Sequence, residues 1–433
     1  MKVAFYIANR VYAPNINLAS LYFGNPGIGG TEYVMLLVAQ HLSSSDNDMS
    51  VYIYMDREGR FAGGLNTIIL PDVEKAAIDA AYNGCTHFIF DCKWVDWTKR
   101  PFSNLSDSIK LIVWNHNIIN AKMLHNICAN EHLGKIVCVG REHRDLYRDD
   151  WTYKYMDYIY NCVPFPVGIK KQVEECPFEK RKHIVTYIGS LTPRKTFHVL
   201  AQVWPDVLRQ VPDAELYVIG SAELYDDIDK LGPYKIAEES YEATFMPYLT
   251  KDGRILDSVH FLGALGIEKN EILLKTKVGV PNPAGKTETF CLSAVEMQIA
   301  GCVTTAIQAP GYFDTMYNGV IVRDKKQLTT SIVNLLLSEK PLKTYDETIN
   351  FIEENFSIQV VSDQWSRLLQ SDLSTPVSSV SPLMNKWYRW KWLKEVMRQI
   401  KLLIPALYKF PYVVEDFMHK YEKLFVEWEY RLY

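Results

Sequence analysis

Long apolar runs are missing from this chain of 433 residues. A helix needs about 20 consecutive apolar residues to cross a bilayer, and no segment approaches that length. The opening MKVAFYIANR is interrupted at Asn9 and Arg10, so it is too short for a secretory signal peptide and is typical of a first β-strand. These absences predict a cytoplasmic protein without a transmembrane helix.

Cysteine pairs and a strong charge imbalance are also missing. The eight cysteines are scattered, without a C-x-x-C pair, so the sequence indicates neither a disulfide framework nor a zinc site. Scattered thiols fit the reducing cytoplasm. A formal net charge of −4 gives no basis for binding a polyanion, and we predict no nucleic-acid partner.

An acidic metal-binding motif is missing from the places where catalysis would need one. The D-x-D tripeptide from Asp227 to Asp229 lies in a charged, helix-like stretch, whereas the metal-binding form of this motif follows a buried strand. A solvated helix face is the simpler interpretation. We therefore predict no catalytic metal and no bound cofactor.

The sequence does contain a repeated alternation of strand and helix signals. Apolar strand signals recur at 3–8, 51–55, 86–91, 111–117, 135–140 and 158–163. A second series follows Pro164, Pro166 and a charged linker, at 184–191, 214–220, 259–264, 277–282, 302–307 and 319–324. Strands that alternate with helices predict parallel sheets covered by helices. We expect an α/β protein with two facing Rossmann-like domains, residues 1–163 and 177–370, and a helical tail, residues 384–433.

The first predicted strand leads into a glycine-rich turn. Gly29 and Gly30 lie in the segment Gly27-Ile-Gly-Gly-Thr-Glu32, and the apolar run YVMLLVAQHL after it predicts a helix. A strand, a glycine turn and a helix bring backbone N–H groups against a phosphate. The glycines do not fit G-x-G-x-x-G, so a nicotinamide dinucleotide is not indicated. A plain tight turn is the alternative.

The most informative stretch runs from Val280 to Gly301, VPNPAGKTETFCLSAVEMQIAG. A proline-rich loop precedes Glu288, and the run LSAVEMQIA predicts a helix that Gly301 ends. Glu296 lies about one turn into that helix. The unpaired N–H groups of the helix start form a site for a phosphate or a sugar oxygen. One carboxylate beside this site can accept sugar hydroxyls, and the other can accept ribose hydroxyls.

This stretch resembles the E-x7-E motif of the retaining GT-B glycosyltransferases of family 4. The matching residues are Glu288, Phe290, Leu292, Glu296, Met297 and Gly301. Asn282 stands where serine is usual, and Cys291 stands where glycine is usual, so the sugar pocket is expected to differ in shape. The resemblance implies the GT-B fold, a nucleoside-diphosphate sugar as donor, and retention at the anomeric carbon. It also implies donor contacts by Phe290, Cys291 and Leu292.

Two segments near strand ends extend the resemblance. Gly189 to Lys195 resembles the family segment G-R-L-x-x-x-K-G. Lys195 then matches the residue that holds the donor diphosphate, whereas Ser190 replaces the family's arginine and Arg194 is the candidate for that second charge. His116 corresponds to a histidine near the reacting sugar, with a hydrogen-bonded core histidine as the alternative.

Further matches complete the expected site. Gly29 and Gly30 resemble the glycine loop that opens the family's first helix. The resemblance therefore implies catalytic roles for Glu288, Lys195 and His116, and donor binding by Gly29, Gly30, Arg194, Lys195, Phe290, Cys291, Leu292 and Glu296. We expect transfer of a sugar to a hydroxyl of a glycan, lipid-linked or protein acceptor.

Two other functions remain open at this point. Ser190 and Cys291 fit a degenerate relative that holds a nucleotide sugar or a partner without turnover. Gly285-Lys-Thr resembles the end of an ATPase P-loop, but Val280 stands where that pattern needs glycine, and prolines in the loop lack the N–H groups that would hold phosphate.

The tail from Met384 has a composition of its own. Its large apolar residues recur at helical spacing, at Trp387, Trp390, Met397, Ile400 and Ile404. The same segment is rich in lysine and arginine. Packing of the apolar stripe on the first domain is one expectation. The other is contact of residues 384–404 with an anionic membrane surface, peripheral to the cytoplasm.

Overall fold

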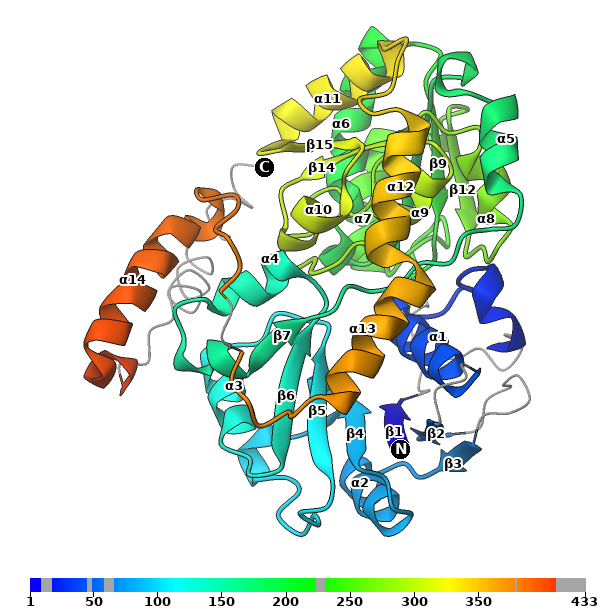
Figure 1. Cartoon of the computed structure of the whole chain (residues 1–433). Coiled ribbons are helices and arrows are strands. Elements are labelled where there is room, and N and C mark those ends of the chain that lie inside the picture. The colour runs from blue at the N-terminus through cyan, green and yellow to red at the C-terminus, as the bar shows by residue number, and fades with distance from the viewer. Residues whose placement is uncertain (9–17, 45–48, 58–65, 223–229, 378–379, 410–433) are drawn as a thin grey trace.

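The computed structural model describes residues 1–8, 18–44, 49–57, 66–222, 230–377 and 380–409. Two α/β domains lie one above the other, and each is built on a parallel sheet (Figure 1). Two parallel sheets formed by successive halves of the chain confirm the predicted fold class.

The first sheet has seven strands in the order β3-β2-β1-β4-β5-β6-β7, and every neighbouring pair is parallel. Its strands are β1 (Lys2–Ile7), β2 (Ser50–Met55), β3 (Asn66–Ile69), β4 (His87–Phe90), β5 (Lys110–Asn115), β6 (Leu133–Cys138) and β7 (Met156–Tyr158). Helices α1 (Gly30–Ser44), α2 (Val73–Tyr82), α3 (Ala121–Cys128) and α4 (Arg141–Arg144) accompany it. Strand residues such as Phe5 and Ile112 are fully buried, as expected for a sheet covered on both faces.

The second sheet has six strands in the order β12-β9-β8-β13-β14-β15, also parallel throughout. Its strands are β8 (Ile184–Ile188), β9 (Glu215–Ile219), β12 (Val259–Gly263), β13 (Val278–Gly279), β14 (Val303–Ile307) and β15 (Gly319–Val322). A short antiparallel hairpin, β10 (Thr250–Lys251) and β11 (Arg254–Ile255), lies outside this sheet. The accompanying helices are α6 (Phe197–Gln210), α7 (Glu239–Leu249), α8 (Lys269–Leu273), α9 (Leu292–Ile299), α10 (Pro310–Thr315) and α11 (Lys325–Leu337).

Two details between the domains differ from the prediction. The strand predicted over 158–163 ends at Tyr158, because the chain then turns toward the second domain, where Val163 N donates to the carbonyl oxygen of Phe356 at 2.9 Å. The predicted linker contains a helix, α5 (Ile169–Glu175). Its buried Ile169 and Val173 are four residues apart, so they share one face that packs into the core.

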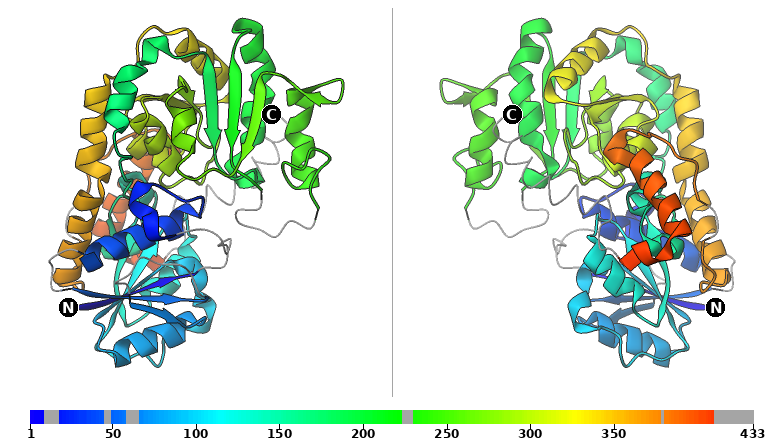
Figure 2. Two further views of the ribbon diagram at one scale, coloured as in Figure 1. Left: turned by 90° about the vertical axis from the view of Figure 1, so that its right-hand side faces the viewer. Right: turned by 90° about the vertical axis from the view of Figure 1, so that its left-hand side faces the viewer.

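Two helices carry the chain back from the second domain to the first. α12 (Tyr345–Phe356) is followed, after Ser357, by α13 (Ile358–Gln370). Together they run along one side of the molecule, α12 beside the second domain and α13 beside the first (Figure 2). The apolar face of α13 packs beside α1 in one core cluster.

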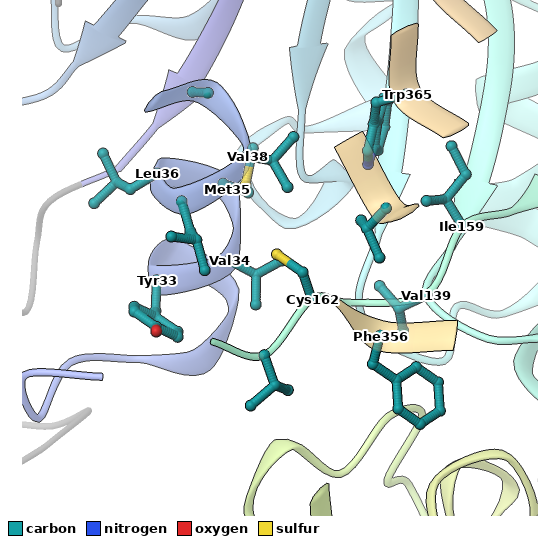
Figure 3. Packing of buried hydrophobic residues seen from close by; sticks show 14 of the residues in the cluster. Tyr33, Val34, Met35, Leu36, Val38, Val139, Ile159, Cys162, Phe356 and Trp365 are labelled. Carbon is teal, nitrogen blue, oxygen red and sulfur yellow. The ribbon is translucent and has the colours of Figure 1, made fainter. Parts of the chain in front are cut away.

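One hydrophobic core cluster joins the domains at this crossing (Figure 3). Trp365 of α13 packs on Trp114 of β5 with ring centroids 4.4 Å apart. The cluster also contains Val34 of α1 and Val295 of α9. The core therefore holds the first turn of α1 against the start of α9, which brings the glycine turn and the Glu288 loop together.

The tail contacts the first domain through its lysine side chains and not through its apolar stripe. α14 (Lys391–Leu403) turns its lysines inward, and Lys391, Lys394 and Lys401 are buried. The predicted packing of the apolar stripe is wrong, because Trp387 is 79% exposed and Ile404 is 52% exposed. Acidic residues and backbone carbonyls of the first domain bind the lysines instead. The tail beyond residue 409 lies outside the described residues.

Candidate active site

A cleft between the two domains has a volume of about 680 Å³, which is within the usual range for small-molecule sites. Both domains line it, with Gly30, Glu32 and His116 from the first and Lys195 and Glu288 from the second. The lining residues follow the carboxyl ends of strands of both sheets. Open α/β sheets bind their ligands at this edge.

The glycine turn forms one wall of the cleft. Asn25 Oδ1 accepts hydrogen bonds from the backbone N–H groups of Gly27 and Ile28, each at 2.9 Å, and so shapes the turn from within. Gly30 lines the cleft, and a Cβ on it would lie 2.9 Å from Leu292 Cδ1. Gly29 is not among the lining residues, and its carbonyl oxygen accepts from Tyr33 N.

Glu288 lies at the centre of a polar group in the loop before α9. Lys195 Nζ donates to Glu288 Oε2 at 2.9 Å, and the Asn282 side-chain amide donates to the same oxygen. The Glu288 carbonyl oxygen accepts from Gly311 N at 2.8 Å. The side chain and the backbone of Glu288 are therefore both held by hydrogen bonds, and the carboxylate lines the cleft before a ligand arrives.

The start of α9 lies directly beside this group. Phe290, Cys291 and Leu292 line the cleft. Cys291 is the N-cap residue and makes no side-chain capping hydrogen bond, so the first N–H groups of α9 remain available to an anionic ligand. Burial, followed by the Glu288 carboxylate, raises the pKa of the Cys291 thiol to about 12. The thiol is therefore neutral and unsuited to act as a nucleophile.

The second glutamate of the motif is paired with a lysine that no sequence signal singled out. Lys269 Nζ, at the start of α8, lies 2.8 Å from Glu296 Oε1. Both line the cleft, and the Lys269 side chain is only 7% exposed. Lys269 escaped prediction because it belongs to no motif and is brought to Glu296 only by the fold.

Two glycines allow the backbone segments that follow β8 and β9 to approach each other closely, near Lys195 in the chain. Gly189 N, after β8, donates to the carbonyl oxygen of Ile219 at 3.0 Å. Gly220, after β9, has a φ of 145°, and a Cβ on it would lie 1.8 Å from the Gly189 carbonyl oxygen. Only glycine fits there. Ser190 is buried in this wall, whereas Arg194 is exposed at the rim.

His116 connects the domains at the floor of the cleft. Its carbonyl oxygen accepts from Thr289 Oγ1 at 2.6 Å, so the first domain touches the residue next to Glu288. Burial lowers the pKa of the imidazole well below its usual value, with smaller contributions from Lys93 and His143. The ring is therefore neutral. Among the described residues its Nε2 atom is buried without a hydrogen-bond partner.

Several polar residues of the cleft were missed by the sequence analysis. Lys93 Nζ lies 3.1 Å from Glu32 Oε1 on the first-domain side. Asn117 and Asn161 also line the cleft, and Asn161 Oδ1 is buried without a partner in the described part of the chain. Isolated asparagines in loops carry no distinctive pattern, so only the fold reveals them.

Within the described residues, no group of three histidine, cysteine, aspartate or glutamate side chains could hold a metal ion. Asp227 and Asp229 lie outside the described residues, so the absence of a catalytic metal stays a prediction. No helix in the described ranges is long and apolar enough to cross a membrane.

Comparison with known proteins places this cleft in a family context. Residues 169–351 match the family model of glycosyl transferases group 1. This segment contains Lys195, Glu288 and Glu296. No curated protein matches the chain in a sequence search.

Solved structures match most of this chain in fold at low sequence identity. Anabaena HepE in complex with UDP and glucose matches with a TM-score of 0.59 and 14% identity, over 85% of this chain and 99% of that one. A glycosyltransferase from Rickettsia africae matches with a TM-score of 0.58 and 12% identity, over 86% and 99%. The catalytic domain of starch synthase IV from Arabidopsis thaliana, bound to ADP and acarbose, matches with a TM-score of 0.56 and 12% identity, over 86% and 99%.

Proposed function

We propose that this chain, which has the GT-B fold and whose residues 169–351 match the family model of glycosyl transferases group 1, is a glycosyltransferase that transfers a sugar with retention at the anomeric carbon. The donor is a nucleoside-diphosphate sugar, and the acceptor is a hydroxyl of a glycan, a lipid-linked molecule or a protein. The observation that carries the proposal is the Lys195–Glu288 pair beside the uncapped start of α9.

The diphosphate is the leaving group, and its growing negative charge needs stabilisation. Lys195, which lines the cleft, is the cation that we assign to this charge, and Arg194 at the rim supplies a second. The first N–H groups of α9 and the backbone at Gly30 add fixed dipoles. Gly29 is outside the lining set, so this part of the proposal rests on Gly30. When the diphosphate binds Lys195, Glu288 is released to accept hydroxyls of the donor sugar.

The remaining site residues have complementary roles. Glu296 accepts ribose hydroxyls, and Lys269 holds its carboxylate in place. Phe290 and Leu292 form the apolar wall beside the sugar, and the side chain of Cys291 narrows the approach. His116 is neutral and offers Nε2 to a hydroxyl of the reacting sugar. Closure of the two domains excludes water from this group, which limits donor hydrolysis.

The acceptor and the setting of the protein are proposed as follows. The first domain, residues 1–163, receives the acceptor, and the second, residues 177–370, holds the donor. The protein is cytoplasmic, and the exposed apolar face of residues 384–404 rests on a membrane surface. The burial of Lys391, Lys394 and Lys401 removes much of the charge on which an anionic membrane would act, so apolar contact has to dominate.

A binding protein without turnover is the second candidate. Cys291 and Ser190 both line the cleft, at positions where the related motifs have glycine and arginine, and this favours a degenerate site. A P-loop ATPase is not supported, because α9 begins at Leu292 and not at Lys286, whereas a P-loop places its lysine at the helix start.

Ligand-induced stabilisation and donor hydrolysis separate these candidates. We expect UDP or GDP to raise the melting temperature and ATP not to do so. Mass spectrometry should then show slow hydrolysis of the matching nucleotide sugar, which Glu288→Gln abolishes while nucleotide binding persists. Stabilisation by a nucleotide sugar that stays intact with every acceptor would favour the binding protein. Stabilisation by ATP alone would overturn the proposal.

A further inference from the structure

The two domains meet at a second place, away from the α12–α13 crossing. Asp314 of α10 faces the start of α4, where Glu142 N donates to Asp314 Oδ2 at 2.9 Å. Tyr160 OH donates to Asp314 Oδ1 at 3.2 Å. A Cβ on Gly140 would lie 2.8 Å from Asp314 Oδ2, so the approach depends on glycine. This contact joins a helix of the second domain to a helix of the first.

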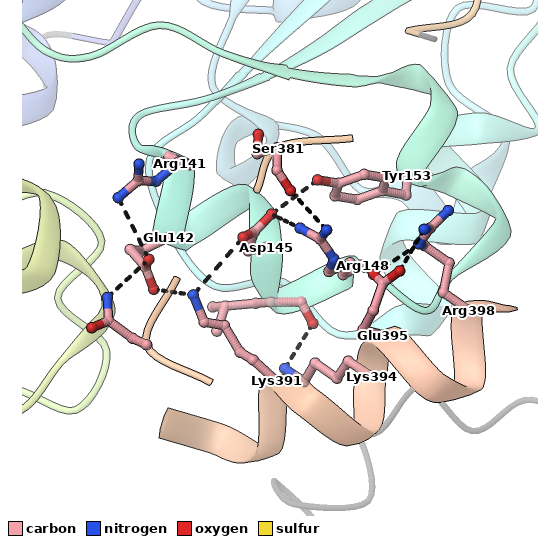
Figure 4. A network of polar contacts seen from close by, with 12 residues as sticks. Arg141, Glu142, Asp145, Arg148, Tyr153, Ser381, Lys391, Lys394, Glu395 and Arg398 are labelled. Atoms are coloured by element: carbon pink, nitrogen blue, oxygen red, sulfur yellow. Dashed lines mark hydrogen bonds and ion pairs between the residues drawn. The ribbon is translucent and has the colours of Figure 1, made fainter. Parts of the chain in front are cut away.

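The tail secures the α4 side of this contact (Figure 4). Lys391 Nζ is completely buried and donates to Glu142 Oε2. The same ammonium group lies 3.8 Å from Asp145 Oδ2. Asn385 Nδ2 donates to Glu142 Oε1 at 3.1 Å. Glu142 therefore bonds to α10 through its backbone and to the tail through its carboxylate.

The same stretch of tail also touches the second domain. The Tyr388 ring packs on Phe313 of α10 with centroids 4.8 Å apart. Arg389 Nη1 donates to the carbonyl oxygen of Lys286 at 3.5 Å, in the loop before Glu288. We call residues 385–391 the tail strap, because they contact both domains across the α4–α10 junction.

α10 also contacts the loop that carries Glu288. Gly311 N donates to the carbonyl oxygen of Glu288 at 2.8 Å. Tyr312 OH donates to the carbonyl oxygen of Asn282 at 2.5 Å and lies 3.1 Å from that of Pro281. The loop that carries Glu288 is thus held by the helix that the tail strap holds. A movement of α10 has to move Glu288 relative to Lys195.

We propose that the tail strap keeps the two domains closed and positions the Glu288 loop, with Lys391 and Tyr388 as positioning residues. Neither side chain lines the cleft, so both act through α4 and α10. Loss of either is expected to open the cleft and to displace Glu288. The kinetic part of this inference rests on the proposed function, whereas the structural part does not.

The test compares two strap variants with one matched control. Lys391→Met removes the buried ammonium group, and Tyr388→Ala removes the ring at Phe313. Lys401→Met is the control, because in the described part of the chain Lys401 contacts Asp149 of the first domain, whose carbonyl oxygen lies 2.7 Å from Lys401 Nζ, and the Tyr408 ring of the tail. All three variants weaken the tail, but only the first two disturb the junction with α10.

Domain separation is measured without any substrate. Spin labels are placed at Tyr82 and Leu337, which are exposed on the first and second domains, after the partly exposed Cys128 and Cys176 are changed to serine. We expect Lys391→Met and Tyr388→Ala to lengthen and broaden the distance distribution and Lys401→Met to leave it unchanged. If Lys391→Met fails to fold, Tyr388→Ala decides alone.

Kinetics supply the second readout. Both strap variants should lower kcat about tenfold while the KM for the donor changes less, because Glu288 acts on turnover. Lys401→Met should keep the wild-type values. Unchanged distances in a folded strap variant, or equal changes in the control, would overturn the inference. If no donor is ever turned over, the proposed function fails, and the distances still decide the role of the strap.

Discussion

At the scale of single residues, the two glutamates of the cleft differ in their partners. Glu288 accepts a hydrogen bond from Lys195, and in the proposed reaction its carboxylate changes partner when the diphosphate binds that lysine. Glu296 is held by a buried lysine, Lys269, and in the proposed reaction it keeps that partner. The first arrangement suits a group that acts during transfer, and the second suits a group that reads the ribose.

Glu296→Ala should therefore weaken nucleotide binding, whereas Glu288→Ala should mainly lower turnover. Removing Glu296 takes away a charged hydrogen-bond acceptor worth about 1.5–3 kcal/mol, or about 10- to 150-fold in Kd. Calorimetric titration with the nucleoside diphosphate measures this loss. The exposed Glu339→Ala serves as the control. An unchanged affinity in Glu296→Ala would contradict the assignment of Glu296 to the ribose.

The raised pKa of Asp314 leads to a prediction about how stability depends on pH. Burial and the neighbouring Glu142 raise its pKa from an ordinary 3.8 to about 7. Between these values the folded protein holds a proton that the unfolded chain has lost, so the stabilisation is complete below about pH 4 and is lost as pH rises through about 7. The full shift corresponds to an upper bound of about 4 kcal/mol.

Asp314→Asn should remove this dependence. Urea unfolding at pH 5 and pH 8 measures the free energy of unfolding of both proteins, and the difference between them isolates Asp314 from other titrating groups. We expect the wild type to lose more stability than the variant between these two pH values. Parallel pH profiles would show that Asp314 keeps an ordinary pKa in the fold.

At the scale of elements, the tail helix shows where sequence patterns stop being informative. The spacing of Trp387, Trp390 and Ile400 predicted a helix, and α14 confirms it from Lys391 onward, whereas Trp387 and Trp390 precede the helix. The pattern did not reveal which face packs, because that depends on acidic residues of α4 nearly 250 positions away in the chain. Similarly, α9 was predicted from its own residues, whereas the helix within the linker and the partner of Glu296 depend on tertiary contacts.

Deleting residues 384–433 should destabilise the protein. The deletion removes Asn385 and Lys391 from the buried Glu142 carboxylate, and breaking a buried ion pair by removing one partner costs about 3–5 kcal/mol. A melting curve of the truncated chain checks this expectation, and a fall of several degrees is predicted. If the truncated chain has the same melting temperature as the full-length protein, these contacts contribute nothing to stability.

The exposed face of the tail leads to a separate prediction about membranes. Vesicle sedimentation should show binding that depends weakly on salt and occurs with neutral as well as anionic lipid, because the lysines face the protein. Trp387→Ala with Leu403→Ser should reduce binding, since each exposed side chain contributes about 1.5–3 kcal/mol when buried. The exposed pair Tyr82→Ala and Leu342→Ser, which is distant in sequence, is the control. If the full-length chain does not sediment with vesicles of either lipid composition, the proposed membrane contact is wrong.

At the scale of the whole molecule, alternating strand and helix signals were sufficient to predict two parallel sheets. They could not supply the geometry between the sheets, which is set by the crossing of α12 and α13 and by Trp114 against Trp365. Lys195 and Glu288 were expected in one site from their motifs, and the fold brings them within 2.9 Å. The first-domain lining residues Lys93, Asn117 and Asn161 had no comparable signal.

Turnover by the whole enzyme should be independent of divalent metal. The charge on the leaving diphosphate is balanced in the proposal by Lys195, Arg194 and the start of α9, so no cation is needed for it. Activity in EDTA should equal activity in Mg²⁺ or Mn²⁺, measured by release of the nucleoside diphosphate. Loss of turnover in EDTA that Mn²⁺ restores would contradict this prediction.

The crossing helix α13 also has a consequence for synthesis on the ribosome. Trp365 covers Trp114 in the first domain, yet it emerges roughly 250 residues later, or about 12–50 s at 5–20 residues per second. Until α13 has been synthesised, the apolar surface of the first domain beside α1 lacks the helix that packs on it. Nascent chains of this protein should therefore depend on cellular chaperones during that interval. Folding of the amino-terminal half is completed only by one of the last segments to be made.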